Sequence, residues 1–156
     1  MSLLGTPLEP LDPRWPITLA FKNLLSGYVD PKNDRVVEIA SKIPDARGSY
    51  DWVKSNIIYL PEKKEHFQPP DETLDRLTGD CEDDWILLSS LHKAQGYRSR
   101  ARVLLWTQAK PGDIEFHIYN QVYDGGEWVD ADASDARSEY GTARTDGGIE
   151  VAVFEI

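Results

Sequence analysis

Three residues suited to nucleophilic catalysis occur in this sequence in the order cysteine, histidine, aspartate. Cys81 is the only cysteine, and it follows Gly79 and Asp80 at the start of a long apolar segment. His117 and Asp132 lie in two later segments with the alternation typical of strands. A cysteine thiolate attacks a carbonyl carbon, a histidine transfers the proton, and a carboxylate orients the imidazole. The types and order of these residues indicate an enzyme with a cysteine nucleophile.

The expected position of Cys81 is the first residue of a helix that Asp80 caps. There the positive end of the helix dipole and the free backbone N–H groups stabilise a thiolate. The pKa of a free thiol is about 8.5, and a helix start with a neighbouring imidazolium lowers it. The acidic residues Glu82, Asp83 and Asp84 act in the opposite direction, because carboxylates disfavour a second nearby anion. We interpret these three as residues that complement the helix dipole, without a catalytic role.

The sequence offers three histidines as partners for Cys81. His92 lies on the same helix, and eleven residues at 1.5 Å per residue place it roughly 16 Å away, so we expect it to be structural. His66 falls in a polar loop, which is a poor position for a precisely placed base, although geometry does not exclude it. His117 alternates with apolar neighbours on a strand and faces the polar side, where a cleft would lie. His117 is therefore the expected base.

The hairpin after His117 identifies a carboxylate. Asp124-Gly125 is a type I′ turn signal, and as a two-residue loop it places His117 opposite Asp132. Opposite side chains on one face have Cβ atoms about 5 Å apart. If Gly125-Gly126 forms the loop instead, the two residues become diagonal neighbours on the same face, whereas a three-residue loop would separate their faces. Asp130 shares the face of Asp132 and is the reserve candidate.

Hydrophobic periodicity predicts helices in the first half of the chain and strands in the second. Four prolines among residues 1–16 indicate an irregular N-terminal arm, followed by a single domain over residues 17–156. The expected helices cover residues 34–43, 49–57 (with Ser49 as N-cap), 71–77 and 81–95. The expected strands cover residues 101–106, 114–123, 127–132 and 149–156. Helices followed by an antiparallel sheet define an α+β protein.

Composition and charge exclude several classes of function. The chain has 156 residues and a formal net charge of −10, without a cluster of basic residues, so we expect no nucleic-acid partner. No apolar run approaches the roughly 20 residues of a membrane span. One cysteine forms no internal disulfide, and the start of the chain lacks a secretion signal. We therefore expect a cytoplasmic protein; the oligomeric state is left open.

Other segments carry weaker signals. Residues 130–135 alternate oxygen-bearing side chains as a calcium loop does, but Asp135 and Gly141 stand where an EF-hand requires Gly and Glu. We therefore predict no metal and no cofactor. The five tryptophans are expected in the core, with Trp85 packed beneath Cys81. Residues 138–148, rich in Gly and Thr, are expected to form a loop beside the cleft.

The combined motifs resemble those of the transglutaminase-like superfamily. Residues 79–83 read G-D-C-E-D, residues 117–123 read H-I-Y-N-Q-V-Y, and residues 126–132 read G-E-W-V-D-A-D. The corresponding patterns of that family are G-D-C-x-D, H-x-W-N-E-V-Y and G-x-W-V-x-x-D-P-T. The resemblance covers residues 49–134. The spacing of the three motifs together is far more specific than any one of them.

This resemblance implies a papain-like α+β core with a Cys-His-Asp triad. By motif position, Cys81 is the nucleophile, His117 the base and Asp132 its orienting carboxylate, and the Trp-Val-x-x-Asp spacing favours Asp132 over Asp130. The chain departs from the family at Tyr119 (often Trp), at Gln121 (often Glu) and at 133–134, where Ala-Ser replaces Pro-Thr. None of these departures affects the triad.

The expected function is a cysteine peptidase or amidase that acts on a peptide or protein amide through an acyl-enzyme. We expect hydrolysis because the chain has little room for domains that would shield the acyl-enzyme from water. Two alternatives remain open: an acyltransferase that passes the acyl group to an amine, and a non-catalytic binding module. Fold alone does not set the reaction.

Overall fold

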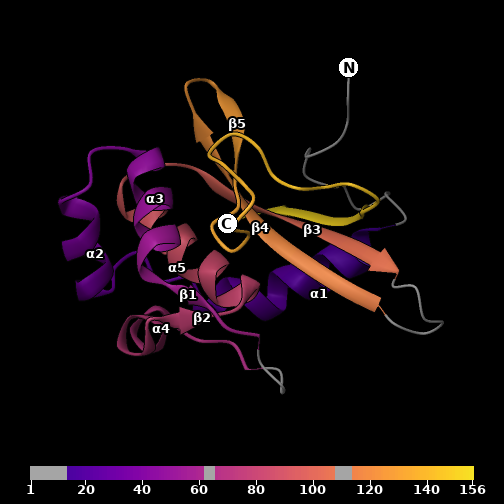
Figure 1. Cartoon of the computed structure of the whole chain (residues 1–156), viewed down its shortest axis with the longest axis horizontal. Coiled ribbons are helices and arrows are strands. Elements are labelled where there is room, and N and C mark those ends of the chain that lie inside the picture. Colours follow the sequence, from indigo (N-terminus) through magenta and orange to yellow (C-terminus); the bar gives the residue numbers. More distant parts are fainter. Residues whose placement is uncertain (1–13, 62–65, 108–113) are drawn as a thin grey trace.

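The structure is a computed structural model that describes residues 14–61, 66–107 and 114–156. Most of the helices gather at one end, and a four-stranded antiparallel sheet extends from them (Figure 1). The helices in chain order are α1 (Trp15–Leu25), the 3₁₀ helix η1 (Ser26–Tyr28), α2 (Asp34–Ser41), α3 (Ala46–Asn56), α4 (Pro70–Arg76) and α5 (Cys81–Ala94). The strands are β1 (Ile58–Tyr59), β2 (Thr78–Gly79), β3 (Ser99–Thr107), β4 (Ile114–Asp124), β5 (Glu127–Ala131) and β6 (Ile149–Glu155). The predicted α+β class is confirmed.

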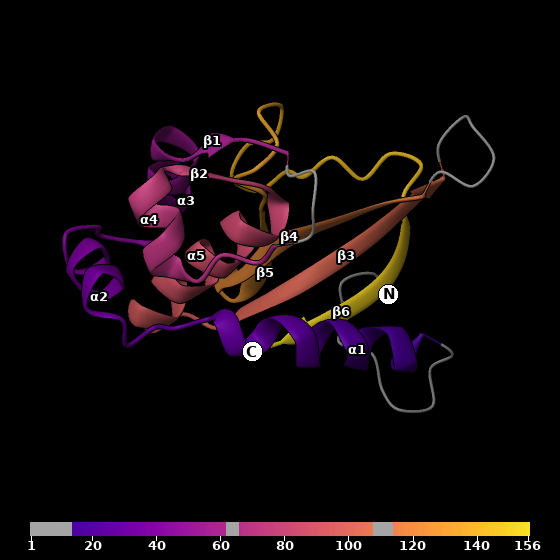
Figure 2. The same cartoon turned by 90° about the horizontal axis from the view of Figure 1, so that it is seen from below.

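The main sheet has the strand order β5-β4-β3-β6, and every neighbouring pair is antiparallel. The short strands β1 and β2 form a separate parallel pair just before α5. Helix α5 packs on β4 and β3, and α1 lies along β6 (Figure 2). Two apolar clusters fill the interior: one joins α2, α3 and α5, and the other joins α1, the first half of α5 and the sheet. Helix α5 is therefore the central element, and its first turn meets β4.

Two helix starts differ from the sequence prediction. Trp15 and Pro16, which were assigned to the irregular arm, open α1, because a proline fits the first turn of a helix; residues 1–13 lie outside the described residues. Ser49 is not the N-cap of α3. Asp45 caps that helix by accepting a hydrogen bond from the Gly48 N–H at 2.7 Å, while Ser49 is buried inside the helix.

The β4–β5 hairpin adopts the second of the two anticipated two-residue registers. Gly125 and Gly126 form the turn with φ of +64° and +85°, and Asp124 pairs with Glu127. A type I′ turn requires positive φ at both central positions, which two glycines adopt more easily than Asp-Gly. The register that placed His117 directly opposite Asp132 is therefore wrong.

None of the helices in the described part of the chain has the length and apolar character needed to cross a membrane.

Candidate active site

A network of backbone and carboxylate groups fixes the start of α5. Asp80 accepts a hydrogen bond from the Asp83 N–H at 3.2 Å, and Asp83 returns one by accepting from the Asp80 N–H at 3.1 Å. The second oxygen of Asp83 accepts from the Gln68 N–H at 2.8 Å. A Cβ on Gly79 would lie 2.8 Å from the Cβ of Asp83, so only glycine fits there. The G-D-C-x-D motif is thus a capping box that places Cys81 on the first residue of the helix.

The Cys81 thiol is nearly buried and lies against a carboxylate. Its side chain is 8% exposed, and Sγ donates a hydrogen bond to Oε2 of Glu82 at 3.3 Å. Burial raises the pKa of the thiol well above its usual value and the Glu82 charge adds to this, while a hydrogen bond from the Ile118 N–H opposes it. The expected lowering by the helix start is outweighed, so the resting group is a neutral thiol.

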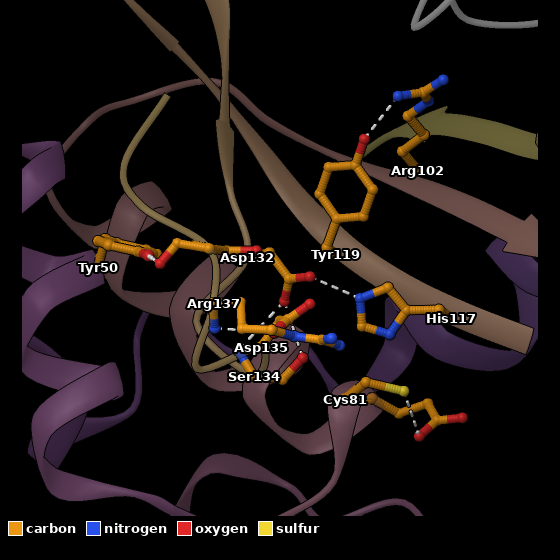
Figure 3. Close-up of polar contacts among 11 residues, drawn as sticks. Tyr50, Cys81, Arg102, His117, Tyr119, Asp132, Ser134, Asp135 and Arg137 are labelled. Atoms are coloured by element: carbon orange, nitrogen blue, oxygen red, sulfur yellow. Dashed lines mark hydrogen bonds and ion pairs between the residues drawn. The ribbon is translucent and has the colours of Figure 1, made fainter. Parts of the chain in front are cut away.

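His117 and Asp132 form a short hydrogen bond. Nε2 of His117 lies 2.6 Å from Oδ2 of Asp132, which is almost completely buried (Figure 3). The other oxygen of Asp132 accepts from the backbone N–H of Ser134 at 3.1 Å and from its hydroxyl at 2.8 Å. Burial lowers the pKa of His117, but the hydrogen bond and charge of Asp132, together with the charges of Asp135 and Glu115, raise it, and the net shift is upward. Asp132 is therefore held in place from one side and orients the imidazole on the other.

The structure brings all three predicted residues to one place. Figure 3 shows the His117 ring between the other two residues, with Nε2 toward Asp132 and the opposite edge toward Cys81. The Ile118 N–H, next to His117 in β4, contacts the Cys81 sulfur. The nucleophile comes from the start of α5, the imidazole from the middle of β4, and the carboxylate from the residue that follows β5. This arrangement leaves Nδ1 as the imidazole nitrogen on the side of the thiol.

The alternative residues have other partners. His92 is completely buried and bonded to the Ala46 carbonyl at 3.0 Å, and burial lowers its pKa to about 4, as a structural histidine requires. His66 lies 2.8 Å from a carboxylate oxygen of Glu72. Asp130, the reserve candidate, accepts a hydrogen bond from the Gln121 amide at 2.7 Å. Asp132 and not Asp130 is the partner of His117.

Two aromatic rings flank the imidazole, and one of them, Trp106, was not predicted to lie at the site. The centroids of Trp106 and Tyr119 each lie 6.0 Å from that of His117, and Tyr119 stacks at an interplanar angle of 26°. The Tyr119 hydroxyl accepts a hydrogen bond from Arg102 at 2.7 Å (Figure 3). Trp106 was assigned to the core with the other tryptophans. The pairing of Leu104 with His117 places Trp106 diagonal to it, a position that the register of β3 and β4 would have indicated.

The acidic residues of α5 do more than complement the helix dipole. Asp84 is 3% exposed, and one of its carboxylate oxygens has no hydrogen-bond partner among the described residues. Burial raises the pKa of Glu82 and of Asp83 to about 7 and that of Asp84 to about 8. Negative charge near the thiol is thus partly suppressed at neutral pH.

A cavity of about 600 Å³ opens beside the imidazole. Its walls combine aromatic and charged side chains: Tyr59, Trp106, Glu115, His117, Ser134, Asp135, Ala136, Arg137 and Arg144. Arg144 comes from the loop over residues 138–148, which confirms the expectation that this loop borders the cleft. Cys81 is not among the described lining residues and is nearly buried next to the cavity wall formed by His117.

The α+β fold, with α5 packed on an antiparallel sheet, is similar to that of transglutaminase-like cysteine proteases. The sequence model of the transglutaminase-like superfamily matches residues 33–133, and the chain belongs to this superfamily. A search of curated protein sequences gives no match.

Solved structures share the fold at low sequence identity. A provisionally assigned cysteine protease from Cytophaga hutchinsonii superposes with a TM-score of 0.60 at 20% identity, over 98% of this chain and 51% of its own. A provisionally assigned protease from Parabacteroides distasonis gives 0.59 at 13% identity, over 89% and 30% of the two chains. LapG of Legionella pneumophila gives 0.54 at 18% identity, over 86% and 72%. The chain thus spans about half of the first relative and less than a third of the second.

Proposed function

We propose that this protein is a cysteine hydrolase that cleaves a peptide or other amide bond through an acyl-enzyme on Cys81. One observation carries the proposal: the hydrogen bond of 2.6 Å that holds the His117 imidazole to Asp132 with its opposite edge toward the thiol (Figure 3). A base must lie within reach of the proton it moves and be oriented by a third group. Membership in a superfamily that takes its name from transglutaminases supports acyl chemistry at this cysteine.

In the proposed first half-reaction, His117 takes the thiol proton while Sγ of Cys81 bonds to the carbonyl carbon. The carbonyl electron pair moves onto oxygen and gives a tetrahedral oxyanion. When the oxyanion collapses, the C–N bond breaks, and the leaving amine takes the proton from His117. The product is a thioester on Cys81 and a free amine.

In the second half-reaction, water attacks the thioester carbonyl and gives a proton to His117. Collapse of this intermediate breaks the C–S bond, releases the carboxylic acid and returns the proton to the sulfur. Asp132 holds the tautomer of the imidazole and stabilises the imidazolium. The two hydrogen bonds from Ser134 keep that carboxylate in position.

Two donors are proposed for the oxyanion. The first is the backbone N–H of Cys81, which is at the N-terminus of α5. The second is the Tyr59 hydroxyl, because Tyr59 lines the cavity and interacts electrostatically with Cys81. Burial, followed by the negative charges around Cys81, raises the pKa of Tyr59 to about 12, so the phenol keeps its proton. A protonated phenol donates to an oxyanion at neutral pH.

The test uses p-nitrophenyl acetate, an activated ester that any such thiol would accept. The proposal predicts release of p-nitrophenol with an acetyl group on Cys81, found by intact mass and peptide mapping. Cys81→Ala should abolish this adduct, whereas His66→Ala, a matched histidine substitution outside the site, should leave it unchanged. Undiminished turnover in Cys81→Ala would contradict the proposal. Adding an amine during turnover then separates hydrolysis, which yields acetate, from acyl transfer, which yields the acetylated amine.

A further inference from the structure

The loop over residues 138–148 presents Arg144 to the cavity at the candidate active site. Trp106 anchors the end of this loop. Its indole N–H donates to the Asp146 carbonyl at 2.7 Å, and a Cβ added to Gly148 would lie only 2.9 Å from its ring. Because Trp106 also contacts the His117 ring, the same side chain connects the arginine-bearing loop to the imidazole. Arg144 is thus positioned at the site by a residue of the site.

Arg144 forms no hydrogen bond, ion pair or ring contact with the other residues that the structure describes. Every other described arginine is paired with an oxygen acceptor of the protein. Arg137, on the wall of the same cavity, pairs with Asp135 at 3.4 Å. A guanidinium has five donors and no acceptor, and its planar fork matches a carboxylate. Arg144 is thus an exposed lining residue whose donors have no acceptor in the described part of the protein.

Among the described residues that line the cavity, Arg144 is the cation without a partner, and it favours a ligand with an anionic end. The positive charge of Arg137 is offset by Asp135, and Glu115 lies in β4 beside His117, where it raises the pKa of the imidazole. Trp106 and Tyr59 supply apolar surface for the hydrocarbon part of a ligand.

We propose that Arg144 binds a carboxylate of the substrate and makes the enzyme selective for amides that carry an acidic group near the bond to be cleaved. This inference rests on the proposed function, since it assigns a substrate class to the same site. Arg144 acts in it as a specificity-determining residue and takes no part in proton transfer.

A binding measurement tests this without depending on the chemistry of Cys81. In the ¹⁵N-labelled protein, the Nε–Hε resonance of Arg144 is identified by its loss in Arg144→Gln. Titration with N-acetyl-β-alanine should shift this resonance to saturation, and N-acetyl-β-alaninamide, which has no carboxylate, should leave it in place. No shift with the acid, or an equal shift with the amide, would overturn the inference.

A kinetic measurement tests the position of the carboxylate relative to the thiol. N-iodoacetyl-β-alanine and its carboxamide both alkylate a cysteine, with a new C–S bond formed as iodide leaves with its electron pair. The ratio of the acid rate to the amide rate should fall about threefold to tenfold in Arg144→Gln, the size of effect expected when a partly exposed charged hydrogen bond is lost. Arg144→Lys should retain part of the ratio, because it keeps the charge but not the fork.

Arg47→Gln is the matched control, because it removes one positive charge from an exposed helix position away from the cavity. It should leave the ratio unchanged. An equal ratio in the wild type and in Arg144→Gln would overturn the inference. If neither reagent modifies Cys81, the proposed function fails, and the NMR titration still decides whether Arg144 binds a carboxylate.

Discussion

The contact between Cys81 and Glu82 leads to a prediction about the reactivity of the thiol. Sγ lies 3.3 Å from Oε2 of Glu82, and the pKa of Glu82 is about 7. Above that pH the carboxylate is ionised and disfavours the thiolate; below it the carboxyl group is neutral and the effect disappears. Glu82→Gln removes the charge but retains an acceptor oxygen. The pKa of Cys81 should therefore fall in this variant.

The magnitude follows from Coulomb's law. Two unit charges 3.3 Å apart interact by about 1.3 kcal/mol in a dielectric of 80 and by about 5 kcal/mol at an effective 20. Glu82 is partly exposed, so the interaction energy between the two charges lies nearer to about 1.3 than to about 5 kcal/mol. With about 1.4 kcal/mol for each pKa unit, we expect the pKa of Cys81 to fall by about 1–2 units.

The assay is the second-order rate of alkylation by iodoacetamide between about pH 6 and pH 10, because only the thiolate reacts. The midpoint of the profile should move to lower pH in Glu82→Gln, and the two profiles should converge below the pKa of Glu82. Glu38→Gln, which changes an exposed carboxylate on α2, is the control and should not move the midpoint. An unchanged or higher midpoint in Glu82→Gln would refute this account of the thiol.

Three further predictions concern neighbouring residues. Asp84→Asn should raise the free energy of unfolding in urea by about 2–4 kcal/mol near pH 9 and by little near pH 4. The pKa of Asp84 in the folded protein is about 8, above the usual 3.8. The native wild-type protein therefore loses stability as the pH rises from about 3.8 to about 8, whereas the variant does not. An equal gain at both pH values would contradict this. Ser134→Ala removes the 2.8 Å hydrogen bond to Asp132 and should slow acylation by p-nitrophenyl acetate about threefold to tenfold, whereas Ser134→Thr should keep most of the rate; equal losses in both variants would argue against the bond. Tyr59→Phe should slow the same acylation about tenfold or more without changing alkylation by iodoacetamide, which forms no oxyanion; equal losses in both reactions would contradict the proposed donor.

The sequence contained enough to predict the residues that meet at the site. Cys81 is placed by a capping box whose residues are adjacent in the chain, and local patterns of this kind are readable from sequence. His117 and Asp132 belong to one hairpin, so the turn limited their possible pairings to a few. The choice between two glycine-containing turns was not readable, because each satisfies the same turn preference. That His117 and Asp132 share one face of the hairpin was predicted correctly, since both two-residue loops place them on the same face.

Features set by contacts distant in sequence were not predicted. Helix α1 was not predicted, because the four prolines among residues 1–16 indicated an irregular arm that includes the first two residues of this helix. Its packing against β6 is a contact across most of the chain. The pKa of Cys81 depends on burial, which a motif does not reveal, and the expected direction was therefore opposite to the one found. The contact of Trp106 with His117 required the register of β3 against β4. Arg144 reaches the cavity through a loop that has no repetitive pattern.

The central claim is that Cys81 and His117 act as one catalytic unit, and the most direct measurement is a double-mutant cycle. Release of p-nitrophenol from p-nitrophenyl acetate is compared in the wild type, Cys81→Ala, His117→Ala and the double variant, with circular dichroism to check the fold. Each single substitution should reduce the rate about a hundredfold or more, and the double variant should lose no more than the worse single one. Losses that add in free energy, or a rate unaffected by His117→Ala, would contradict the claim.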